Sequence, residues 1–174
     1  TGFEHRREEV SGYVPEEYQS GWFVGNYKPN FGSYDVTEGY VEALVPLAEG
    51  LNFNGAIRGT DYSTSGLVTT WKAGLTYEPV PDLLFRVTRS RDIRAPNLAE
   101  LFQAGSTRTN NLIDPFNNNQ VVQFRETATG NLALDPEEAD QWNLGVVVRP
   151  RFLPGLSVSA DYYTIDINGS IGSG

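Results

Sequence analysis

The sequence predicts an all-β fold, an antiparallel up-and-down meander of about seven strands that forms part of a transmembrane β-barrel. Two observations predict this fold class. Apolar and polar residues alternate with a period of two over runs of about 9–12 residues. Short connections containing Gly or Pro also alternate with long polar connections along the chain. In barrels of an outer membrane, short turns face one side of the membrane and long loops face the other.

Each expected strand is bounded by its alternation. Residues 51–60 give the clearest pattern, with Leu51, Phe53 and Ile57 opposite a polar set that includes Arg58. The expected strands are residues 1–10, 37–47, 51–60, 67–78, 82–90, 141–149 and 156–163. The first two are the least regular. Strands of soluble proteins usually have about 5–6 residues, whereas a tilted strand needs about 9–11 to cross a bilayer.

The connections predict how the strands are ordered. Short turns at 48–50, 79–81 and 150–154 should lie at one end of the sheet. The longer or more polar connections, residues 11–35, 61–66 and 92–139, should lie at the other end. A soluble β-sandwich also alternates apolar and polar residues, so it stays open as an alternative. A 48-residue connection, however, is unusual in a compact domain.

Composition excludes several classes of function. The 22 acidic and 13 basic residues give a net charge of −9, which argues against binding to nucleic acid. Cysteine is absent and His5 is the single histidine, so we expect no thiolate or multi-histidine metal site and no cofactor. No Gly-x-Ser-x-Gly elbow is present, and we expect no catalytic residues and no enzyme.

The chain also carries no sign of a helical membrane anchor. No apolar run approaches the roughly 18 residues that a membrane helix needs, and the charged start does not resemble a signal peptide. Methionine is absent, including at position 1, so we expect Thr1 to follow an internal cut in a longer protein.

Five segments, taken in order, resemble TonB-dependent receptors. Residues 86–102 (RVTRSRDIRAPNLAELF) are similar to the family's S-x-x-x-R-A-P-x-x-x-E-L-F element. Residues 130–145 (GNLALDPEEADQWNLG) are similar to its G-N-x-x-L-x-P-E element, and residues 153–167 to the strand that follows. Residues 36–47 and 61–66 resemble an earlier strand and hairpin, and the order and spacing agree from about residue 32 to 169.

The resemblance implies a receptor of the Gram-negative cell outer membrane that imports scarce nutrients with energy delivered by TonB. Such receptors are barrels of about 22 strands around a plug. Residues 1–174 would be a partial β-barrel domain in contact with outer-membrane lipid. No plug, TonB box or C-terminal strand is recognisable, so the TonB complex would engage other parts of the parent protein. Seven strands cannot close such a barrel, and we expect the piece alone not to transport.

The resemblance also bears on the transported ligand. The Leu-Pro-Gly-Leu strand at 153–156 and the long loops are similar to the receptors associated with plant-derived oligosaccharides. We therefore favour an oligosaccharide over a ferric siderophore or cobalamin. The alternative function is that of a soluble β-sheet carbohydrate-binding module.

A structural motif is expected at Arg94, Pro96 and Glu100. Pro96 fixes its own φ and keeps Ala95 away from the α region, which ends the strand. Glu100 could then pair with Arg91 or Arg94 at the outer end of the strand. We interpret the motif as a structural clamp, with ligand contact as the alternative.

The candidate ligand-binding residues lie in the middle of the 92–139 connection. They are Arg108, Asn110, Asn111, Asp114, Phe116, Asn117 and Asn119. Amides both donate and accept hydrogen bonds, and Phe116 could stack on a sugar face, which suits a neutral polyol. The alternatives are a mobile polar loop, because asparagine favours turns, and a calcium site, for which the spacing of the oxygen ligands is not a recognised one.

Overall fold

The computed structural model describes residues 1–23 and 25–172. Val24, Ser173 and Gly174, which the predicted domain of residues 1–174 includes, lie outside the described residues. The chain divides into two compact units. Unit 1 comprises Thr1–Arg6, Val36–Ala95 and Asp135–Gly174, and unit 2 comprises Arg7–Asp35 and Pro96–Leu134.

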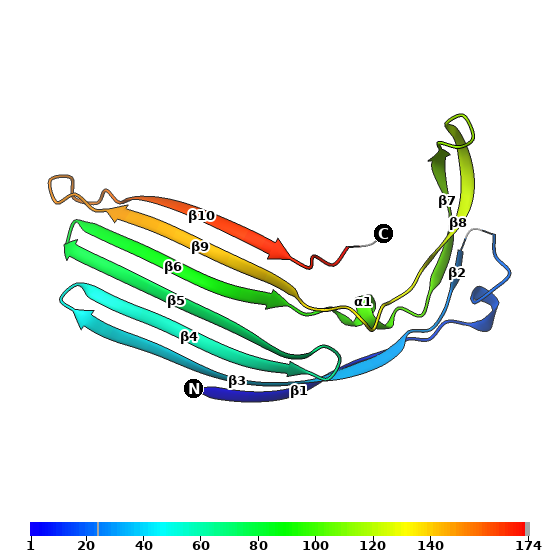
Figure 1. Cartoon of the computed structure of the whole chain (residues 1–174), viewed down its shortest axis with the longest axis horizontal. Coiled ribbons are helices and arrows are strands. Elements are labelled where there is room, and N and C mark those ends of the chain that lie inside the picture. Colours follow the sequence, from blue (N-terminus) through cyan, green and yellow to red (C-terminus); the bar gives the residue numbers. More distant parts are fainter. Residues whose placement is uncertain (24, 173–174) are drawn as a thin grey trace. The chain divides into compact units, whose positions relative to one another are not determined.

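A seven-stranded sheet forms the framework of unit 1. Its strand order is β1-β3-β4-β5-β6-β9-β10, so the seven expected strands are confirmed (Figure 1). The strands are β1 (Gly2–Ser11), β3 (Phe31–Ala48), β4 (Leu51–Tyr62), β5 (Gly66–Val80), β6 (Leu83–Arg94), β9 (Glu137–Val148) and β10 (Val158–Asn168). Several are longer than predicted: β3 has 18 residues, and β5 continues to Val80, through the expected turn.

The short turns gather at one end of this sheet, as predicted. The Glu78 N–H donates to the Gly50 carbonyl at 2.8 Å, and the Arg149 N–H donates to the Asp82 carbonyl at 2.8 Å, so neighbouring turns bond to one another. At the opposite end Tyr62 pairs with Gly66. The 92–139 connection leaves and re-enters the sheet at that same end, because Arg94 pairs with Glu137. Figure 1 shows the same alternation of ends from β3 to β10.

The register separates the side chains of the sheet into an apolar face and a polar face. Phe53 pairs with Leu75, Leu75 with Val87, and Val87 with Leu144, which places apolar side chains from four strands in one row. Ile57 is 54% exposed and Leu144 is 48% exposed, because the described residues of unit 1 form one sheet and supply no second layer to this face. A sandwich would bury these residues between two sheets.

The apolar face changes character toward the end opposite the short turns. The guanidinium of Arg89 lies over the Trp142 ring, 4.9 Å from its centroid. One row further, Arg91 donates to both carboxylate oxygens of Asp140, at 3.1 and 2.8 Å. A band of apolar side chains that ends in an amphipathic indole and then in ion pairs is the arrangement expected at a lipid–water boundary.

The polar face carries a cross-strand ion pair that the sequence did not predict. Arg86 on β6 binds Asp161 on β10 in bidentate fashion, with three hydrogen bonds of 2.8–3.0 Å. The pair passes over Gly145 on the intervening strand β9, where a Cβ atom would collide with both side chains. Arg86 therefore makes a cross-strand contact that joins β6 to β10 on the polar face.

Unit 2 contains regular structure where the sequence predicts only connections. A second sheet has the order β2-β7-β8, formed by β2 (Gly25–Tyr27), β7 (Ser106–Asp114) and β8 (Gln120–Ala128). Two short helices, η1 (Glu16–Tyr18) and α1 (Leu98–Phe102), complete the unit. No helix among the described residues is long and apolar enough to span a membrane.

Charge should be tolerated on one face of the seven-stranded sheet only. In the full-length protein, Phe85→Arg or Val146→Arg should impair assembly in the outer membrane, because a cation at the bilayer midplane costs about 2–4 kcal/mol. Asn143→Arg on the polar face is the matched control. The amount of heat-modifiable, membrane-assembled protein is the measurement. Equal assembly of all three variants would contradict the assignment of the faces.

Candidate functional site

The Arg94–Glu100 motif lies where β6 ends. Arg94 donates two hydrogen bonds to the Glu137 carboxylate, 2.8 Å from Nε and 2.9 Å from Nη2, across the β6–β9 pair. Arg91 is on the other face of the same strand and pairs with Asp140. Adjacent residues of a strand face opposite sides, which is why Glu137 meets Arg94 while Glu138 approaches Arg91 at 3.5 Å.

Residues 96–102 form a short capped helix at the start of the unit 2 part of the long connection. The Asn97 side chain accepts hydrogen bonds from the Ala99 and Glu100 N–H groups, and Glu100 accepts one from the Asn97 N–H at 2.7 Å. This reciprocal arrangement is a capping box. The Glu100 carbonyl also accepts a hydrogen bond from the Asn131 N–H at 2.8 Å. The two motifs that resemble the receptor family therefore meet at this point.

The candidate ligand-binding residues lie on the β7–β8 hairpin. Arg108 pairs with Glu126 in the register, and its guanidinium donates to the Glu126 carboxylate at 2.8 Å. The Asn110 amide donates to the other oxygen of the same carboxylate at 3.1 Å. Asp114 faces the same side as Asn110, whereas Asn111 faces the opposite side. The hairpin thus brings Arg108 and Asn110 together and separates Asn111 from them.

The remaining candidates form the tip of the hairpin. The Phe116 N–H donates to the Asp114 carboxylate at 2.9 Å, and the Gln120 N–H donates to the Asn117 carbonyl at 3.0 Å. Asn118 and Asn119 both have positive φ, 53° and 56°, a conformation that asparagine tolerates better than most residues. The Phe116 ring is 98% exposed. Asn119 thus has a turn-forming role, and Phe116 projects from the tip.

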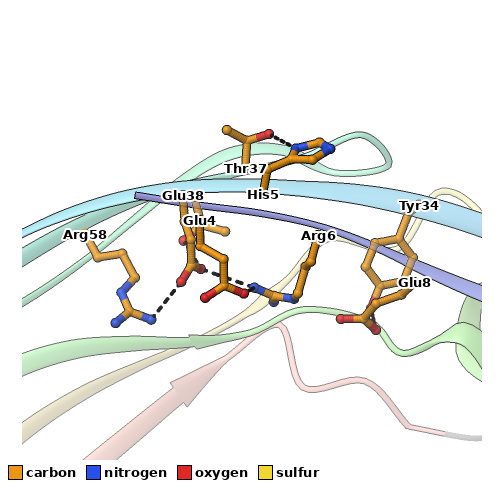
Figure 2. Close-up of polar contacts among 9 residues, drawn as sticks. Glu4, His5, Arg6, Glu8, Tyr34, Thr37, Glu38 and Arg58 are labelled. Atoms are coloured by element: carbon orange, nitrogen blue, oxygen red, sulfur yellow. Dashed lines mark hydrogen bonds and ion pairs between the residues drawn. The ribbon is translucent and has the colours of Figure 1, made fainter. Parts of the chain in front are cut away.

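A second polar group, unpredicted from the sequence, surrounds Glu38 on the polar face of the seven-stranded sheet. Its carboxylate is nearly buried and lies 3.6 Å from the Arg6 guanidinium and 3.3 Å from that of Arg58. Thr60 donates to it at 3.4 Å. Figure 2 shows Glu38 between Arg6 and Arg58, with His5 and Thr37 on the other side of the strands.

The Glu38 group borders a hollow of about 480 Å³ on the polar face. Arg58 lies over the Tyr40 ring, 5.0 Å from its centroid, and Lys72 and Asp92 also line the hollow. Among the described residues, no group of three or more His, Cys, Asp or Glu side chains is placed to hold a metal ion. The chemistry that this surface offers is charged hydrogen bonding to a polar partner.

Comparison with known proteins establishes the class. The family model for the β-barrel of TonB-dependent receptor-like proteins matches residues 1–174. The chain therefore belongs to the TonB-dependent receptor family, as the motifs predicted. This is a family of transport receptors, and it does not favour the soluble carbohydrate-binding module. A search of curated proteins found no match.

Solved structures with the same fold come from siderophore receptors. The siderophore receptor PirA from Acinetobacter baumannii is 18% identical, with a TM-score of 0.64 over 78% of this chain. PirA from Pseudomonas aeruginosa is 18% identical, with a TM-score of 0.63 over 79%. The ferric enterobactin receptor PfeA from Pseudomonas aeruginosa is 16% identical, with a TM-score of 0.64 over 82%. This chain spans 18%, 24% and 19% of those chains, respectively.

The Glu38 group should tie the edge strand β1 to the sheet. Glu38→Ala removes a shared partner of Arg6 and Arg58, and should lower the free energy of unfolding by about 1–2 kcal/mol. The loss is modest because both guanidinium groups are part-exposed and can be hydrated. Glu42→Ala, at an exposed position of the same strand, is the control. Hydrogen exchange of residues 2–6 is the measurement, and equal protection in both variants would contradict this role.

Acid should loosen the β7–β8 hairpin. The hydrogen bonds from Arg108 and then Asn110 hold the pKa of Glu126 below its ordinary value of 4.5. A lowered pKa stabilises the folded hairpin at neutral pH, and this contribution is lost as the pH falls through the lowered pKa. Exchange protection of residues 106–128 should therefore fall in acid. Glu126→Gln should be less protected at pH 7 and less sensitive to acid; an unchanged acid response in this variant would refute the assignment.

Proposed function

We propose that residues 1–174 form a partial β-barrel domain, seven adjacent strands in the wall of an outer-membrane TonB-dependent receptor of a Gram-negative bacterium. The observation that carries the proposal is the single sheet of unit 1, with an uncovered apolar face and a face of ion-paired polar side chains. A single layer with two such faces suits a wall between lipid and a wet lumen.

The partners in this proposal follow from the two faces. Outer-membrane lipid contacts the apolar face, and the lumen side contacts the ligand or other parts of the same receptor. The TonB complex supplies energy through parts of the full-length protein other than these strands. The whole receptor imports a scarce nutrient, and this chain contributes wall and loop rather than catalysis.

The Arg94, Pro96 and Glu100 motif serves as a structural clamp in this proposal. Arg94 holds the end of β6 to Glu137, and Glu100 closes the capping box that follows. Both contacts lie where the chain leaves the barrel wall. A structural role accounts for these contacts without invoking a ligand.

The proposed ligand class is an oligosaccharide rather than a ferric siderophore or cobalamin. Unit 2 carries eight acidic and four basic side chains, a net charge of −4. An anionic ferric chelate would be repelled by this excess of acid, whereas a neutral sugar would not. The competing ligand class is a ferric siderophore, because the structurally similar proteins are named as a siderophore receptor and a ferric enterobactin receptor.

Transport by the full-length protein tests this function. A strain that lacks the gene should lose TonB-dependent uptake of an oligosaccharide, and the full-length gene should restore it. The measurement is uptake of labelled cellotriose, xylotriose and maltotriose, set beside uptake of a labelled ferric siderophore. The Phe85→Arg variant is the matched control, because it should fail for lack of assembly. Restoration of siderophore uptake alone would refute the oligosaccharide, and a water-soluble product would refute the barrel.

A further inference from the structure

Three aromatic side chains of unit 2 gather around a hollow that the sequence analysis did not identify. Tyr18 on η1 and Trp22 stack, with ring centroids 6.1 Å apart and an interplanar angle of 18°. Tyr27 on β2 completes the group, and Gly25 lines the same hollow, which has a volume of about 260 Å³. The three aromatic side chains are 49–59% exposed. We call Tyr18, Trp22, Gly25 and Tyr27 the aromatic hollow.

Trp22 is fixed in this arrangement by its neighbours. Its backbone N–H donates to the Asn26 side-chain oxygen at 3.0 Å, and its carbonyl accepts from the Asn26 amide at 2.9 Å. Its indole N–H donates to the Glu17 carbonyl. The polar atom of the ring is thus already engaged. The part of Trp22 that could contact a ligand is therefore the flat face of its indole ring, whose position is fixed by these hydrogen bonds.

Two members of the aromatic hollow, Gly25 and Tyr27, share one face of the β2-β7-β8 sheet with Arg108. Gly25 pairs with Arg108, and Arg108 pairs with Glu126 on the next strand. Tyr27 lies two residues from Gly25, so its side chain points to the same face. Asn110 lies two residues from Arg108 and bonds Glu126. Flat apolar surface and a cluster of hydrogen-bonding groups therefore adjoin on this sheet.

From this juxtaposition we propose that the aromatic hollow is a sugar subsite that takes one neutral pyranose ring, with Arg108, Asn110 and Glu126 receiving its hydroxyl groups. The inference rests on the proposed function and names the site at which an oligosaccharide is first held. A pyranose has an apolar C–H face, which suits an aromatic ring, and a rim of hydroxyls that both donate and accept. Guanidinium and amide groups donate, and the carboxylate accepts.

The charge of the Arg108–Glu126 pair favours a neutral sugar over an anionic chelate. Glu126 neutralises Arg108 at a contact of 2.8 Å, so the cluster presents donors and an acceptor with no excess of positive charge. An anionic chelate needs uncompensated cations, and unit 2 is acidic as a whole. An aromatic ring of such a chelate could stack on Trp22, but the chelate would gain no ion pair. A neutral ring gains both kinds of contact.

The test uses the full-length receptor in detergent and measures binding by calorimetry. The probes are cellotriose, xylotriose and maltotriose, with the ferric complex of 2,3-dihydroxybenzoate as the competing class. Trp22→Ala should weaken binding of at least one trisaccharide about tenfold or more, because a stacking surface is lost. Tyr13→Ala is the matched control: its ring is an exposed aromatic of the same unit, and the variant should bind within about twofold of the parent.

Gly25→Leu is the second variant. It tests the subsite independently of Trp22→Ala, in case that variant fails to fold. A Cβ atom at Gly25 would lie 3.6 Å from the Tyr27 ring and 3.7 Å from the Thr107 carbonyl, which are ordinary contacts. Leucine should therefore fill the aromatic hollow without breaking the sheet, and should also weaken trisaccharide binding about tenfold. Saturation transfer from aromatic protons to the pyranose C–H protons should disappear in the same variant.

The outcomes separate the subsite from the proposed function. Trisaccharide binding that survives both Trp22→Ala and Gly25→Leu overturns the subsite and leaves the oligosaccharide receptor intact. Binding of the ferric complex alone, weakened by Trp22→Ala, overturns the sugar class and assigns the aromatic hollow to a catechol ring of a ferric chelate. Failure of all three trisaccharides to bind also overturns the subsite, while the uptake measurement decides the function independently.

Discussion

The antiparallel hydrogen-bonded ladder determines which surroundings each side chain of the seven-stranded sheet meets. A slip of one residue would move every apolar side chain to the opposite face. The register holds Phe85 beside Val146 and Arg86 beside Gly145, so the two faces keep separate chemistry across the apolar band. The Arg86–Asp161 pair uses this register, because it bridges β6 and β10 over a glycine that leaves the space free.

The same ladder explains why so few side chains are buried. Among the described residues, Val36 is the one large apolar side chain that is fully enclosed. A soluble domain of this length would bury a sizeable core. In a single-layer wall, apolar side chains face lipid instead, and the sheet is stabilised by its backbone bonds, its neighbours in the barrel and its cross-strand ion pairs.

The barrel strands could be predicted because their faces differ in polarity, which leaves a period of two in the sequence. The β7–β8 hairpin left no such trace: Leu112 and Ile113 are consecutive apolar residues that face opposite sides, and both are exposed. Arg108 and Asn110 could be selected as polar residues, but their shared partner Glu126 depends on the register. Trp22 and Tyr27 lay in a stretch without periodicity, and Tyr27 comes to the same face as Arg108 only through the pairing of β2 with β7.

Local pairing, rather than the net charge of −9, decides the charge that the β2-β7-β8 sheet presents around Arg108. Arg108 is one of four basic residues in an acidic unit, yet it does not offer a free cation, because Glu126 holds it. The pair remains a set of directed donors and acceptors fixed on two strands. Such a set distinguishes ligands by the geometry of their hydroxyl groups and contributes little long-range attraction for anions. The proposed sugar subsite combines this set of donors and acceptors with the fixed indole ring of Trp22. A neutral pyranose, which has one apolar face and a rim of hydroxyl groups, requires both.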